Sequence, residues 1–177
     1  MKRTGGFTLV ELAVTLAVLG IILGIAVPSF ASWLLKLQIR NAAEGMLHGL
    51  QLARTEAIKR NSPVTLTLTG GTGWTITDGS GAVMQARPSG EGSQAAFITV
   101  TTPSESFPFP MTFSSLGRLT SAGATTPVTG ATLSAVGISG ADCTAAGPES
   151  CLVVQVSVGG QIRMCDPSPS ATPPRAC

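Results

Sequence analysis

The chain has 177 residues, of which 44% are hydrophobic and only 11% are charged, with 21 glycines, 12 prolines and no tyrosine. This length predicts one globular domain besides any membrane anchor, and the composition suits short strands and many turns rather than a helical bundle. The formal net charge of +2 is too small for a general attraction to nucleic acid, so any such binding would depend on a local basic patch.

An apolar segment follows a short basic leader at the N-terminus. The leader ends in Gly5-Gly6, and residues 7–27 contain a single charged residue, Glu11. About 20 apolar residues are enough for one helical membrane span. A carboxylate within such a span costs roughly 3 kcal/mol, so Glu11 is expected to have a partner. An ordinary signal peptide would have a shorter apolar region followed by a small-residue cleavage site, whereas here the glycines come first.

The helix that begins at residue 7 is predicted to continue to Arg60. Apolar residues recur along its second half at spacings of three and four, which is the pattern of one buried helix face: Ile39, Ala43, Met46, Leu50, Ala53 and Ala57. This face is expected to pack on a sheet. Asn61 is the expected C-terminal cap, and Pro63 prevents the helix from continuing.

Beyond Pro63 the apolar period changes to two, which indicates strands. The strands are expected at 64–69, 74–77, 82–86, 97–101 and 111–113. A tight turn at 115–120 is expected to lead into another strand, and the last hairpin is expected at 152–158 and 161–165. Residues 88–96 read as a loop, residues 121–132 as a region of little order, and the proline-rich residues 167–175 as irregular. The fold class is therefore α+β, with the second half of a long N-terminal helix packed on an antiparallel sheet.

Four cysteines, Cys143, Cys151, Cys165 and Cys177, lie in the last 35 residues. An even number, in a domain that the anchor places outside the cytoplasm, favours two disulfides. With Gly159-Gly160 as a two-residue turn, Cys165 pairs with Val154, and Cys151 lies about 10 Å farther along the strand. Disulfide geometry excludes that separation. Of the remaining pairings we prefer the nearer ones, Cys143–Cys151 and Cys165–Cys177, each of which would contribute up to about 3 kcal/mol.

Metal and catalytic chemistry find little support. Zinc is the competing interpretation of the cysteines, but the sequence has no CxxC pair, and its only histidine, His48, lies far upstream. His48 has no serine or cysteine partner nearby in the sequence. Residues 70–73 lack the lysine and helix of a phosphate loop. We expect no metal, no cofactor and no enzymatic activity.

The N-terminus resembles the type III signal of type IV pilins and type II secretion pseudopilins. The residues that carry the resemblance are Gly6, Phe7, Thr8, Leu9 and Glu11. The resemblance implies cleavage after Gly6 by a prepilin peptidase and N-methylation of the new N-terminal Phe7. It also implies that Glu11 pairs with the N-terminal amine of a neighbouring subunit during assembly, which would offset the cost of burying each charge.

Further blocks resemble the GspH/FimT branch, which comprises minor pilins of type IVa pili and the minor pseudopilin of type II secretion. They are LARTEAIKRN at 52–61, Gly117-Arg118, and residues 151–154 with 160–163. The implied organisation is a leader at 1–6, a membrane and assembly helix at 7–30, and a head domain at 31–177. The implied path is a single-pass inner-membrane protein that joins other minor and major pilins in a filament reaching the periplasm and surface of a Gram-negative bacterium.

The resemblance leaves three functions open. The preferred one is a minor pilin that primes or caps a type IV pilus, and the first alternative is a secretion pseudopilin. The second is a DNA receptor, since some members carry Gly-Arg-x-Arg on the last hairpin. Here Gln161 replaces the first arginine, while Arg163 remains and Arg118 and Arg175 are candidates to lie nearby. So few arginines, without an aromatic platform, predict weak and salt-dependent binding, and we favour Arg163 as an ordinary solvent-facing strand residue.

Overall fold

The computed structural model describes residues 8–103, 106–123, 130–137, 151–167 and 177. The chain divides into two compact units, residues 1–34 and 35–177. Helix α1, Leu9–Arg60, contributes to both. In the first unit every side chain described between residues 8 and 26 is exposed. In the second unit α1 packs on antiparallel strands, so the α+β prediction is confirmed.

The C-terminal end of α1 is closed by Asn61, as expected. Asn61 has a left-handed backbone with φ of 49°. Its N–H donates to the carbonyl of Ile58, and the N–H of Ser62 donates to that of Ala57, both at 3.2 Å. This pair of bonds is the Schellman motif, which satisfies the last helical carbonyls and turns the chain toward the first strand.

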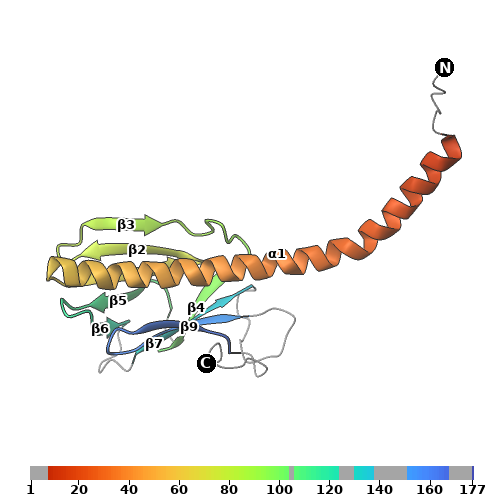
Figure 1. Cartoon of the computed structure of the whole chain (residues 1–177). Helices are drawn as coiled ribbons and strands as arrows, with labels where there is room; N and C mark the ends of the chain where they lie inside the picture. The colour runs from red at the N-terminus through yellow and green to blue at the C-terminus, as the bar shows by residue number, and fades with distance from the viewer. Residues whose placement is uncertain (1–7, 104–105, 124–129, 138–150, 168–176) are drawn as a thin grey trace, which may run out of the picture. The chain divides into compact units, whose positions relative to one another are not determined.

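One sheet has five antiparallel strands in the order β3-β2-β1-β5-β6. These strands are β1 Val64–Gly70, β2 Gly73–Asp78, β3 Val83–Arg87, β5 Phe109–Phe113 and β6 Leu119–Ala122. In β1 the apolar residues alternate inward and the threonines outward, as the sequence pattern predicts. Figure 1 shows β2 and β3 on one side of α1, and β5 and β6 on the other.

The remaining strands form a second sheet in the order β4-β7-β8-β9, where the sequence led us to expect a single sheet. They are β4 Phe97–Thr102, β7 Ala131–Val136, β8 Leu152–Val156 and β9 Ile162–Cys165. The sequence did not predict β7. Five of its six residues are buried, so it lacks the alternation of a half-exposed strand, and its alanines and serine have low strand propensity.

Both sheets and α1 share one hydrophobic core. All six residues of the predicted helix face are buried, each at most 1% exposed. They pack with Phe109 and Phe113 from the first sheet and with Ile98, Leu133 and Val154 from the second. The apolar helix face therefore holds the two sheets together.

The register of the last hairpin differs from the prediction by one residue. Val153, not Val154, lies opposite Cys165, and the strands end at Val156 and begin at Ile162. The N–H of Ser157 donates to the carbonyl of Gln161 at 2.9 Å and continues the pairing, so the turn has three residues, 158–160, rather than two. The N–H of Gly160 donates to the carbonyl of Ser157 at 2.8 Å, and Gly160 itself has φ of 76°. This is the type I turn with a left-handed residue that commonly closes three-residue hairpin loops.

The predicted Cys165–Cys177 bridge is confirmed, with an S–S distance of 2.10 Å and a Cα–Cα distance of 5.0 Å. The predicted Cys143–Cys151 bridge falls on Cys143, which lies outside the described residues. Cys151 is itself disulfide-bonded.

Candidate functional surfaces

The first candidate surface is the N-terminal part of α1. The helix is long and apolar enough to cross a membrane, and Glu11 is the only charged residue from Thr8 to Leu35. Because the described side chains from residue 8 to residue 26 are all exposed, this segment presents an apolar surface that requires a bilayer or other helices to cover it. Gly6 and Phe7, the predicted cleavage and methylation positions, lie outside the described residues.

Glu11 lies in the first turn of α1. Its backbone N–H donates to Thr8 Oγ1 at 3.2 Å, so Thr8 caps the helix. A carboxylate in the first turn is also favoured by the positive end of the helix dipole. No ion pair of Glu11 is present among the described residues.

The second candidate surface is the end of the head domain where two turns meet. The turn that contains Arg118 joins β5 to β6, and Gly117 in this turn contacts Gly160 of the β8–β9 turn. Arg118 is exposed. Arg54 of α1 donates from Nε to the carbonyl oxygen of Gly117 at 3.1 Å. This end of the domain thus gathers two arginines, Arg54 and Arg118, and only Arg118 was predicted from the sequence.

Arg54 belongs to the LARTEAIKRN block, but nothing in the spacing of that block indicates that it reaches a turn 63 residues away. The sequence feature that could have indicated this contact of Arg54 is the predicted tight turn at Gly117-Arg118, because a buried glycine carbonyl in such a turn needs a hydrogen-bond donor. Arg175, the third arginine proposed, lies outside the described residues.

Arg163 lies on β9. It is exposed, and its Nε donates to Gln155 Oε1 on β8 at 2.8 Å. Both side chains line a shallow hollow of about 410 Å³ together with Ser157 and Gln161. Arg118 is not among the residues that line this hollow. The sequence grouping of Arg163 with Arg118 therefore does not correspond to one pocket.

Little in the described residues resembles a catalytic or metal centre. No three His, Cys, Asp or Glu side chains in the described ranges lie close enough together to hold a metal ion. His48 is exposed on α1. Glu56 is paired along the helix with Lys59 at 3.4 Å and with Arg60 at 2.8 Å.

Comparison with known families decides the class of protein. The family model for the type II transport protein GspH matches residues 42–160, and the prokaryotic N-terminal methylation motif matches residues 1–27. The chain belongs to the GspH family. The first match begins within α1 at residue 42 and ends at Gly160 in the β8–β9 turn. The second match covers the apolar segment that contains Glu11.

Solved structures show the same fold as this GspH-family chain. The type IV minor pilin FimU of Pseudomonas aeruginosa, strain PAO1, crystallised in space groups P21 and P65, is 22% identical. The matches cover 78% of this chain and 94% and 98% of FimU, with TM-scores of 0.54 and 0.52. No curated protein sequence matches the chain. The pilin-type fold and the GspH/FimT resemblance are thus confirmed, and the family is a structural one.

Proposed function

We propose that this GspH-family protein is a minor pilin that assembles with other minor and major pilins and primes or caps a type IV pilus. The observation that carries the proposal is the lone carboxylate of Glu11 in an exposed apolar helix. Removal of residues 1–6 by a prepilin peptidase would leave Phe7 as a methylated N-terminus, four residues before Glu11. Pairing of Glu11 with the terminal amine of a neighbour would bury both charges within the filament.

The proposal assigns a location to the apolar helix and to the head domain before and after assembly. Before assembly, the apolar helix at 7–30 lies in the inner membrane. In the filament the same helix packs against those of other subunits, and the head at 31–177 is displayed outside. The Cys165–Cys177 bridge suits this location, because disulfides persist outside the cytoplasm.

Replacement of Glu11 by Gln tests the assembly role. Glu11→Gln keeps the shape of the side chain and removes its charge, and we expect loss of piliation and of co-purifying pilins while the protein remains membrane-bound and processed. Glu11→Asp should restore part of the function. Thr15→Val, in the same exposed segment, is the control and should assemble normally. Unchanged piliation in Glu11→Gln cells would reject the docking role, and mass spectrometry of the mature N-terminus checks cleavage between Gly6 and Phe7.

Type II secretion is the alternative site of action, and the description of the matching family favours it. A deletion strain separates the two functions. If the protein acts in secretion, the deletion lowers export of secreted enzymes and leaves pili intact. The opposite result supports the pilus.

DNA binding is a second candidate, favoured by the two arginines at the meeting turns. Gel shifts of the full-length protein in detergent at two salt concentrations test it. Binding through phosphates should weaken steeply as salt increases. Arg118→Ala should reduce the binding if the meeting turns contact DNA, and Arg163→Ala should reduce it if the residue that the sequence singled out on β9 does so. No shift at low salt would reject the DNA role.

A further inference from the structure

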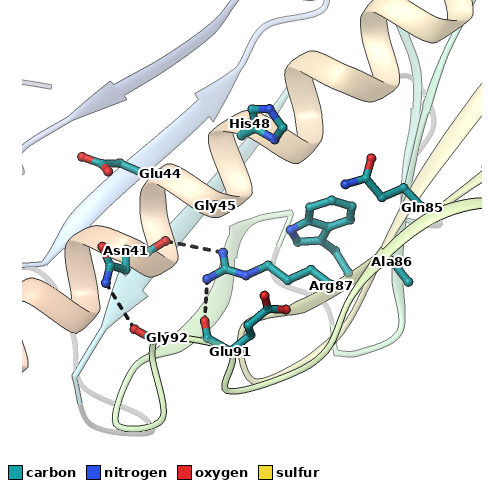
Figure 2. A pocket seen from close by; sticks show the side chains of 10 residues that line it. Asn41, Glu44, Gly45, His48, Gln85, Ala86, Arg87, Glu91 and Gly92 are labelled. Atoms are coloured by element: carbon teal, nitrogen blue, oxygen red, sulfur yellow. Dashed lines mark hydrogen bonds between the residues drawn. The ribbon is translucent and has the colours of Figure 1, made fainter.

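A polar hollow of about 520 Å³ lies beside α1, and the second half of the helix forms one of its walls (Figure 2). Trp74 of β2 and Arg87 of β3 lie opposite each other in the ladder and both line it. On the helix, Gly45 and Gly49 are one turn apart. A Cβ at Gly49 would lie 2.8 Å from the Trp74 ring, and the Arg87 guanidinium lies directly against Gly45. The two glycines therefore let both strand side chains reach the helix backbone.

The Trp74 indole carries an unpaired hydrogen-bond donor. Trp74 is 3% exposed, and its Nε1–H has no acceptor among the residues that the structure describes. It is the only buried side-chain nitrogen or oxygen in the described part of the chain with this property. A buried unpaired donor costs about 1–3 kcal/mol, and buried indole N–H groups usually find an acceptor. Within the described residues the indole N–H therefore remains able to donate to a bound acceptor.

The Arg87 guanidinium in the same hollow has donors to spare. Its Nη2 donates to the backbone oxygen of Glu91 at 2.7 Å, and its Nη1 donates to that of Asn41 at 3.4 Å. A guanidinium has five N–H donors, so most of them remain available. No carboxylate forms an ion pair with Arg87 within the described residues.

Neither of the two acids that line the hollow, Glu44 and Glu91, forms an ion pair with Arg87. Glu44 is paired with Arg40 at 3.5 Å and in Figure 2 points away from Arg87. Glu91 contributes its backbone oxygen rather than its carboxylate. The hollow thus combines an unpaired cation with an unpaired buried donor. That combination selects an anionic oxygen ligand, and a planar guanidinium matches a carboxylate best.

We propose that this hollow binds a carboxylate, held by Arg87 and completed by the Nε1–H of Trp74. The indole nitrogen is covered, so a neighbouring group must move to expose it. Arg87 lies opposite Trp74 in the ladder, and its Nη1 bond to Asn41 is long at 3.4 Å, whereas its Nη2 bond to Glu91 is short at 2.7 Å. The movement that the proposal requires is therefore loss of the Asn41 contact while Glu91 still holds the guanidinium. The carboxylate would belong either to a small molecule or to an acidic side chain of another protein chain, and both sources require the same two donors.

Tryptophan fluorescence of the full-length protein in detergent tests the proposal. The chain has two tryptophans, so Trp33→Phe leaves Trp74 as the only fluorophore. The probes are acetate, N-acetylglutamate α-amide, and a peptide blocked at both ends with one internal glutamate. N-acetylglutamine α-amide is the matched probe without a carboxylate. We expect a saturable change in Trp74 emission with the carboxylates and none with the glutamine derivative.

The arginine variants assign the effect to Arg87. Arg87→Gln should raise the half-saturation concentration of the carboxylates about tenfold or more, and Arg87→Lys should raise it less. Gly45→Ala should also raise the half-saturation concentration, because its Cβ displaces the guanidinium without removing a donor. Lys36→Gln, an exposed cation that does not line the hollow, should have no effect.

The outcomes separate the sources of the ligand. Tighter saturation by the blocked peptide indicates an acidic side chain of another chain, and equal saturation by acetate indicates a small carboxylate. No saturable response to any carboxylate, or an equal response to the glutamine derivative, would overturn the proposal and leave the hollow to solvent. The measurement does not require filament assembly, so its outcome is independent of the proposed function.

Discussion

Gly160, in the β8–β9 turn, lies directly against the backbone carbonyl oxygen of Gly117, in the β5–β6 turn. The N–H of Leu119 donates to the carbonyl oxygen of Val158 at 3.0 Å and joins the same two turns. β6 is the last strand of the first sheet, and β9 is the last strand of the second. The contact therefore ties the edges of the two sheets together where hydrogen bonding along each ladder ends.

The first prediction is that Gly160→Ala destabilises the head domain. A Cβ at Gly160 would collide with the Gly117 carbonyl, and the φ of 76° already disfavours any residue with a Cβ. Strain and overpacking together should lower the free energy of unfolding by about 2–4 kcal/mol in urea titrations. Gly159→Ala is the matched control, because a Cβ there meets nothing closer than Ser157 Oγ at 3.8 Å. Equal losses in the two variants would contradict the close contact.

The second prediction concerns the cap at Asn61. Asn61→Ala places a residue with a Cβ and no turn-forming side chain in the left-handed conformation, and it should lower the free energy of unfolding by about 1 kcal/mol. Asn61→Gly should leave stability unchanged or raise it slightly, because glycine adopts this conformation freely. Thermal unfolding followed by circular dichroism measures both. A loss with glycine as large as that with alanine would mean that the asparagine side chain, rather than the backbone, is responsible.

The elements that the sequence predicts correctly are those whose signal is local. The buried face of α1, its end at Asn61 and the alternation of β1 each follow from spacing within a few residues. β7 is different, because its burial comes from pairing with β4 and β8, both of which are distant from it along the chain. The same limit applies to the candidate surfaces. The sequence singles out Glu11, whereas the contact of Arg54 with Gly117 exists only once the helix has packed on both sheets.

The register of the last hairpin shows why turn type matters. Gly159-Gly160 reads equally well as a two-residue turn or as the end of a three-residue turn, and the two alternatives differ by one residue. The shorter turn would have placed Val154 opposite Cys165. The exclusion of a Cys151–Cys165 bridge still holds in the observed register, because Cys151 lies two residues beyond Val153, the partner of Cys165, where the predicted register placed it three residues beyond Val154.

The third prediction is that the Cys165–Cys177 bridge stabilises the head domain. It connects the buried end of β9 to a residue 12 positions along the chain. Closing a loop of this size contributes about 3 kcal/mol in the chain-entropy description. The double variant Cys165→Ser/Cys177→Ser should therefore lower the free energy of unfolding by about 2–3 kcal/mol. Substitution is preferable to a reducing agent, because a reductant would also break the disulfide of Cys151.

The single variant Cys177→Ser serves as the comparison. It breaks the same bridge but keeps Cys165 as a buried thiol, so the two variants should lose similar stability if the bridge itself matters. A loss confined to the double variant would assign the effect to packing at Cys165 instead.

The fourth prediction links stability to pH through Glu56. The hydrogen bond from Arg60 lowers the pKa of the Glu56 carboxyl below its usual 4.5, the positive charge of Lys59 lowers it further, and partial burial opposes both. Because this pKa is lower in the folded protein than in the unfolded chain, the ionised carboxylate stabilises the fold above pH 4.5. That contribution is lost as the pH falls through the folded-state value.

The test compares urea unfolding of the parent and of Glu56→Gln from about pH 7 to about pH 3. The parent should be the more stable at neutral pH, and its advantage should shrink below pH 4.5, because the protonated carboxyl and the amide of the variant are then both uncharged. Arg60→Gln removes the strongest partner and should reduce the same pH dependence. If the stability difference between the parent and Glu56→Gln stays constant throughout the acid range, the ion pairs on the last turn of α1 do not stabilise the folded protein. The cost of holding the Arg60 and Lys59 side chains in place would then balance their attraction for the carboxylate.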